Sequence, residues 1–160
     1  MTDNAPVTEH ANDLLITRLI PASAHTLFRC WTEPELLKQW FVPRPWTIAR
    51  AEMDVRPGGQ SLVVMRDPDG NEYPNLGTYL EVVADQRLVF TDAYGPGWTP
   101  ADKPFMTAII SFEPEDGQTR YTAMARHWTE EARQQHIAMG FEQGWNICAD
   151  QLQALAATLG

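Results

Sequence analysis

The chain has 160 residues, of which 44% are hydrophobic and 21% charged, a composition that excludes disordered, collagen-like and coiled-coil proteins. Twelve lysines and arginines against twenty-one acidic residues give a net charge of −9, which argues against nucleic-acid or anionic-membrane partners, because both reward clustered cations. We expect a flexible arm over residues 1–13 and a single domain over residues 14–160. The arm has no basic or apolar segment of signal-peptide type, which predicts a cytoplasmic protein.

The first third of the chain predicts one strand followed by two short helices. Residues 14–20 form a run rich in β-formers that ends at Pro21. Ser23 and Thr32 are suitable N-caps, and each is followed by apolar residues at helical spacing. Pro43 then stops the second helix.

The middle of the chain predicts strands separated by turns. Pro-Gly and Asp-Gly pairs are strong turn signals between the apolar runs. The expected strands cover residues 46–54, 60–66, 72–84, 87–93, 105–114 and 118–128. The Pro/Gly-rich segment 95–104 is predicted to be a plain connection, with a lid as the less favoured alternative.

The last segment predicts one long amphipathic helix over residues 129–159. Its apolar stripe, at spacings of three and four, consists of Phe141, Trp145, Cys148, Leu152, Leu155 and Leu159. Gly140 and Gly144 interrupt the same helix and each weaken it by roughly 1 kcal/mol relative to alanine. Two glycines four residues apart indicate a close approach to another part of the protein, with packing favoured over ligand contact.

Cysteines and histidines give no sign of a metal site. Cys30 and Cys148 lie among apolar neighbours and are interpreted as buried reduced thiols. The four histidines lack metal-ligand spacing, and no catalytic or nucleotide-binding motif is visible. We therefore expect no metal and no cofactor, and binding rather than catalysis.

Several segments together carry a resemblance to a known family. They are residues 28–41, 54–59, 68–70, 77–82, 87–91, 131–133 and 139–145. In this order they resemble bacterial homologues of the C-terminal domain of the heat-shock-protein-90 ATPase activator, in the START-like (SRPBCC) superfamily. The resemblance covers about residues 14–158. It implies an α+β helix-grip fold, in which a curved antiparallel sheet wraps around the long C-terminal helix and two short helices follow the first strand.

The resemblance also implies a hydrophobic cavity between the sheet and the C-terminal helix. Our candidates for lining it are Trp40, Trp46, Tyr79, Tyr94, Trp98, His127, Met139 and Trp145. Strand alternation places Tyr121, Ala123, Ala125 and His127 on one face, and the small residues favour that face as the inner one. His136 is a further polar candidate, although a position facing solvent is favoured for it.

Three functional hypotheses remain open at this point. The favoured one is a small-molecule binding protein that holds an apolar or aromatic ligand in the cavity. A cyclase-, aromatase- or hydrolase-like enzyme could use the same cavity, with His127 or a tyrosine moving a proton. The third is a chaperone-linked interaction protein, which we disfavour because the eukaryotic activator has an additional N-terminal domain. The exposed edges of a curved sheet also offer a surface for a homodimer.

Overall fold

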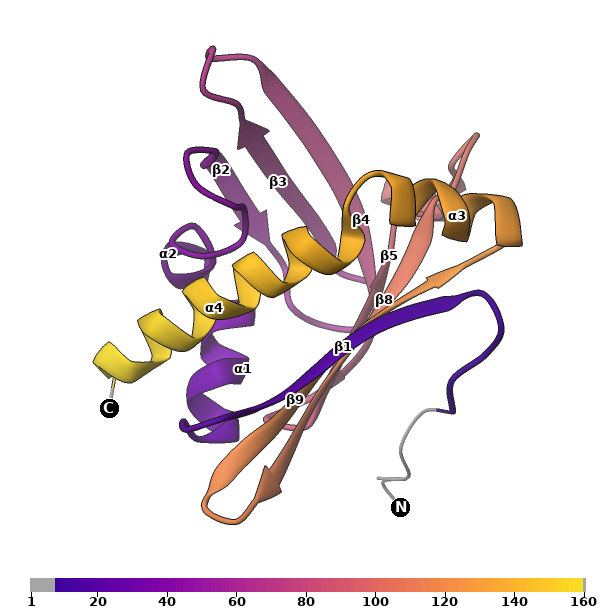
Figure 1. Ribbon diagram of the computed structural model, residues 1–160. Helices are drawn as coiled ribbons and strands as arrows, with labels where there is room; N and C mark the ends of the chain where they lie inside the picture. The colour runs from indigo at the N-terminus through magenta and orange to yellow at the C-terminus, as the bar shows by residue number, and fades with distance from the viewer. Residues whose placement is uncertain (1–7, 160) are drawn as a thin grey trace.

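The structure is a computed structural model in which residues 8–159 are described, and it consists of one curved sheet with helices against one face (Figure 1). The main sheet contains β1 (Asp13–Ile20), β2 (Thr47–Met53), β3 (Gln60–Arg66), β4 (Glu72–Val83), β5 (Arg87–Thr91), β8 (Met106–Glu115) and β9 (Gln118–His127). A small ribbon contains β6 (Tyr94–Gly95), the 3-10 turn η1 (Pro96–Trp98) and β7 (Thr99–Pro100). The helices are α1 (Ala24–Thr32), α2 (Pro34–Leu37), α3 (Glu130–Ala138) and α4 (Phe141–Leu159).

The main sheet is antiparallel throughout, in the order β1-β9-β8-β5-β4-β3-β2. The register shifts between Ile48 and Arg50 in β2 and between Tyr79 and Glu81 in β4. Such bulges bend a strand and increase its twist. The long helix α4 crosses the sheet, with α1 and α2 beside its C-terminal half (Figure 1). This arrangement confirms the predicted helix-grip fold.

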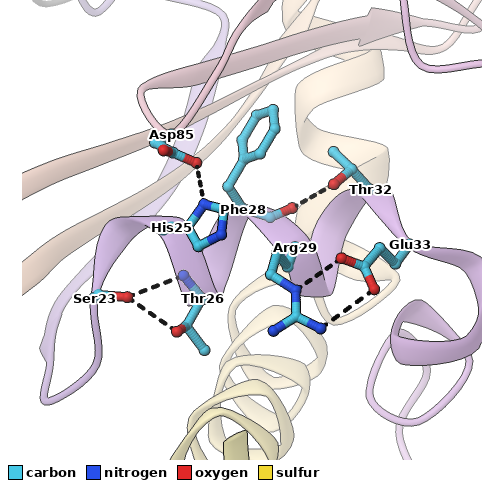
Figure 2. Close-up of polar contacts among 8 residues, drawn as sticks. All are labelled: Ser23, His25, Thr26, Phe28, Arg29, Thr32, Glu33 and Asp85. Carbon is cyan, nitrogen blue, oxygen red and sulfur yellow. Dashed lines mark hydrogen bonds and ion pairs between the residues drawn. The ribbon is translucent and has the colours of Figure 1, made fainter. Parts of the chain in front are cut away.

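Local chemistry sets the beginning of α1 and attaches it to the sheet (Figure 2). The Ser23 side chain accepts a hydrogen bond from the backbone N–H three residues further on, as expected for an N-cap. His25 Nδ1 lies 2.9 Å from the Asp85 carboxylate in the β4–β5 turn. Arg29 and Glu33 form an i,i+4 ion pair with an N–O distance of 2.7 Å.

Aromatic side chains fill the space between the sheet and the helices. The Trp31 ring centroid lies 4.9 Å from that of Trp40, 5.4 Å from that of Phe41 and 5.8 Å from that of Phe90. Trp31 Nε1 donates a hydrogen bond of 3.2 Å to the Tyr121 hydroxyl. A hollow of about 30 Å³ remains beside this cluster, which is room for one or two water molecules. Space for a larger ligand therefore lies elsewhere.

The C-terminal segment differs from its prediction, because two helices replace the single one expected over residues 129–159. Thr129 caps α3 as predicted, by accepting a hydrogen bond from the Ala132 N–H. The chain then breaks at Gly140, whose φ of +89° is a left-handed conformation that glycine adopts without steric cost. A new helix, α4, begins at Phe141. No helix in residues 8–159 is long and apolar enough to cross a lipid bilayer.

The segment before β1 is anchored to β9. Residues 1–7 of the predicted arm lie outside the described residues. Further on, Asp13 is 2% exposed and its carboxylate accepts two hydrogen bonds of 2.9 Å from Arg126, which also donates to the Thr8 carbonyl. Burial alone would raise the pKa of Asp13, but hydrogen bonds from Arg126 and from the backbone N–H of His10 hold that pKa below its usual value. The predicted boundary at residue 14 thus falls inside β1.

Candidate ligand-binding groove

An open groove with a volume of about 530 Å³ lies between α4 and the segment that connects α2 to β2. We call it the α4 groove. It is lined by Phe41, Val42, Pro43, Arg44, Pro45, Trp46, Met65, His136, Met139, Gly140, Phe141, Gly144, Trp145 and Cys148. Its volume is within the usual range for small-molecule sites, and its lining is mostly apolar, as such sites require.

The first wall of the groove is the connection between α2 and β2, and Gln151 of α4 holds it in place. Its side-chain nitrogen Nε2 donates to the carbonyls of Trp40, at 2.9 Å, and Val42, at 2.7 Å. Its oxygen Oε1 accepts from the backbone N–H of Arg44 at 3.2 Å. These three bonds satisfy backbone groups of an irregular segment that prolines prevent from continuing as helix.

The second wall is the junction of α3 and α4, where glycines leave the groove open. A Cβ atom built on Gly144 would have no heavy atom within 4 Å, and one on Gly140 would meet only the Gln143 side chain, at 3.8 Å. The close packing predicted for these glycines is therefore wrong. Their missing side chains instead leave space beside the rings of Phe141 and Trp145, whose centroids are 4.6 Å apart.

Two buried histidines meet at the inner end of this wall. His127, the last residue of β9, is 4% exposed, and His136 in α3 is 7% exposed. His127 Nε2 and His136 Nδ1 are 2.9 Å apart. On its other side, His127 Nδ1 lies 2.8 Å from the backbone carbonyl oxygen of Asn12. The burial of His127 confirms that the face shared with Tyr121, Ala123 and Ala125 is the inner face of β9.

Aromatic rings surround His136. Its ring centroid lies 4.9 Å from that of Phe105, 5.0 Å from that of Phe141 and 6.0 Å from that of Trp145. Burial, with a smaller contribution from the neighbouring His127, lowers the pKa of His136 to about 4. The ring is therefore neutral at physiological pH.

Four of the eight predicted site residues come together at the groove. Trp46, Met139 and Trp145 line it, and His127 contacts its lining through His136. Trp46 also stacks on Tyr73 of β4 with a centroid separation of 5.5 Å. These four remain candidates for ligand contact.

The structure places the other four predicted residues away from the groove. Trp40 and Tyr79 are buried in the core, where Trp40 Nε1 donates to the Cys30 carbonyl at 2.9 Å and burial raises the pKa of Tyr79 to about 12. Tyr94 and Trp98 belong to the β6–η1–β7 ribbon, are exposed, and contact each other with a centroid separation of 6.0 Å. Segment 95–104, predicted as a plain connection, thus contains this short ribbon.

Sequence reasoning favoured a solvent-facing His136, and the break at Gly140 explains the error. A continuous helix would carry the stripe of Phe141 and Trp145 back to Ile137. Because Gly140 resets the helical phase, Ile137 is 43% exposed and His136 faces inward. A glycine read as the end of a helix is the sequence signal that could have placed His136 correctly.

The fold defines this chain as a helix-grip protein of the START-like kind, with an apolar groove beside its C-terminal helix. The chain belongs to the Activator of Hsp90 ATPase homolog 1-like family, whose model matches residues 21–157.

Solved structures of bacterial proteins support this assignment. A crystal structure from Nitrosomonas europaea is 43% identical, with a TM-score of 0.90 over 94% of this chain and 97% of that one. A crystal structure from Mycobacterium smegmatis is 27% identical, with a TM-score of 0.76 over 94% and 96% of the two chains. A solution structure from Staphylococcus epidermidis is 26% identical, with a TM-score of 0.79 over 98% and 96%. No curated protein matches the chain.

Proposed function

We propose that this protein binds a small apolar or aromatic molecule in the α4 groove. The observation that carries the proposal is the groove itself: about 530 Å³ of space lined mostly by apolar and aromatic side chains, with Arg44 and His136 as its ionisable nitrogen groups. Burying apolar ligand surface contributes roughly 25 cal/mol per Å², so a ligand of one or two rings has enough driving force to bind here.

The form of the groove supports binding rather than covalent chemistry. The thiol of Cys148 lines the groove, but burial raises its pKa to about 12, which keeps it protonated and a poor nucleophile. Among residues 8–159, no three His, Cys, Asp or Glu side chains are grouped so that they could hold a metal ion. The histidine pair is bonded to a backbone carbonyl rather than to a carboxylate that would favour its charged form.

A leucine at position 144 provides a direct test. Gly144→Leu fills the groove, because a side chain there meets open space, and it also removes a glycine from a helix interior. We expect the variant to be at least as stable as the wild type and to bind apolar ligands at least about tenfold more weakly, a change of about 1.4 kcal/mol.

The matched control is Ala154→Leu, at an exposed position of the same helix that does not line the groove. Both variants and the wild type are analysed by native mass spectrometry as purified, followed by denaturing extraction of bound compounds. Retention of a compound by the wild type and Ala154→Leu but not by Gly144→Leu supports the proposal. Equal retention by all three proteins contradicts it.

A further inference from the structure

The His127–His136 pair determines whether the polar atom at the groove donates or accepts hydrogen bonds. A backbone carbonyl oxygen only accepts hydrogen bonds, so the 2.8 Å contact with Asn12 requires a hydrogen on His127 Nδ1. When this ring carries only that one hydrogen, its other nitrogen is bare, and His127 Nε2 is then an acceptor. The 2.9 Å contact with His136 Nδ1 therefore places a hydrogen on that nitrogen.

The same reasoning determines the role of the fourth ring nitrogen of the pair, His136 Nε2. Because His136 is neutral and carries its hydrogen on Nδ1, its Nε2 is a bare acceptor. This atom forms no hydrogen bond to a described residue. In the described part of the chain, the only side-chain nitrogen or oxygen that is fully buried without a partner is Gln60 Oε1, so His136 Nε2 is not fully buried. His136 Nε2 is therefore accessible, and the α4 groove is the hollow that His136 lines.

We infer that the α4 groove selects ligands that carry a hydrogen-bond donor, such as a phenolic or alcoholic hydroxyl or an aromatic N–H, which binds to Nε2 of His136. This inference rests on the proposed function and specifies the ligand class. The apolar part of the ligand lies along Trp145, Met139 and residues 42–45, which we call the proline segment, while its donor reaches the inner end of the groove. His127 is a positioning residue, which fixes the tautomer of His136 through the carbonyl of Asn12.

The surroundings make this acceptor selective. An acceptor that is walled by Phe105, Phe141 and Trp145 loses water when an apolar ligand enters, and a buried polar group without a partner is costly. A ligand with a donor restores the lost hydrogen bond. A ligand with only an ether oxygen at the same place leaves two acceptors facing each other.

The test compares 4-propylphenol with 4-propylanisole, which differ in whether the oxygen attached to the ring can donate a hydrogen bond. Dissociation constants are measured by calorimetry for the full-length wild type, His136→Phe and the control His25→Gln, which alters an exposed histidine on α1. We expect the wild type and the control to prefer the phenol by roughly three- to tenfold, the equivalent of one hydrogen bond. In His136→Phe, which keeps an aromatic ring among the same neighbours, the preference disappears.

A second measurement needs no variant. In the 15N NMR spectrum of the wild type near neutral pH, His136 Nε2 should show the shift of an unprotonated imidazole nitrogen and Nδ1 that of a protonated one. The opposite tautomer overturns the inference. Equal affinity for the two compounds also overturns it, while leaving the proposed function intact. Failure of both compounds to bind overturns the proposed function and this inference together.

Discussion

The ring of His136 shows how burial changes the chemistry of a residue. A histidine in water has a pKa near 6.5, whereas burial among aromatic rings and the adjacent His127 lower the pKa of His136 to about 4. No carboxylate of the described residues hydrogen-bonds to either ring of the pair. The neutral form is therefore the one that the folded protein accommodates.

This difference makes stability depend on pH in a defined direction. The unfolded chain binds a proton at residue 136 near pH 6.5, and the folded chain does so only near pH 4, so stability is fully present above pH 6.5 and falls as the pH drops toward 4. Between about pH 7.5 and about pH 5, His136 should account for a loss of about 2 kcal/mol in the free energy of unfolding.

Urea unfolding at these two pH values measures the effect. His136→Phe should lose less stability on acidification than the wild type. An unchanged pH dependence in His136→Phe would show that the buried ring is not the group responsible.

At the scale of the element, the break between α3 and α4 determines what the C-terminal segment presents to the groove. Gly140 and Gly144 are four residues apart, yet they occupy different backbone conformations. Gly140 has a φ of +89°, and Gly144 lies within α4, where its N–H donates to the Gly140 carbonyl at 2.8 Å. The same substitution should therefore have opposite effects at the two positions.

We expect Gly140→Ala to lower the free energy of unfolding by roughly 1–2 kcal/mol, because a Cβ atom makes the left-handed conformation costly. Gly144→Ala should raise it by roughly 0.5–1 kcal/mol, since alanine favours helix and its Cβ meets open space. Chemical denaturation of the two variants checks the sign of each change. Changes of the same sign would contradict the conformations described for this junction.

At the scale of the whole molecule, the groove depends on contacts between distant parts of the chain. Gln151 joins α4 to residues 40–44 by three hydrogen bonds, and the arm before β1 orients His127 through the carbonyl of Asn12. The groove thus depends on the C-terminal helix, on residues 40–44 and, through His127 and His136, on the residues just before β1.

Replacing Gln151 by leucine should loosen the proline segment. The three lost hydrogen bonds leave two carbonyls and one N–H without their partner, so we expect the free energy of unfolding to fall by about 1–3 kcal/mol. The amide hydrogen of Arg44 should also exchange faster with solvent. Gln153→Leu is the matched control, because no described residue hydrogen-bonds to that side chain. If the amide hydrogen of Arg44 exchanged at the wild-type rate in Gln151→Leu, the proposed role of the Gln151 hydrogen bonds would be contradicted.

The sequence by itself determined the family and much of the local structure. The N-caps Ser23 and Thr129 and the alternation along β9 depend on near neighbours, so they could be predicted one element at a time. The predicted cap Thr32 was wrong: it is the last residue of α1, and its hydroxyl donates to the Phe28 carbonyl one turn back. The resemblance then supplied the helix-grip arrangement and drew attention to Trp46, Met139 and Trp145.

Only the tertiary structure decided where the open space lies and which polar atom faces it. The core between sheet and helix is filled by rings from separate elements, so the space expected inside is found at the edge of α4. His136 meets His127 because Gly140 resets the helical phase, and Asn12 fixes the hydrogens of that pair from 115 residues away along the chain. Such contacts depend on the relative placement of whole elements, which no local spacing in the sequence specifies.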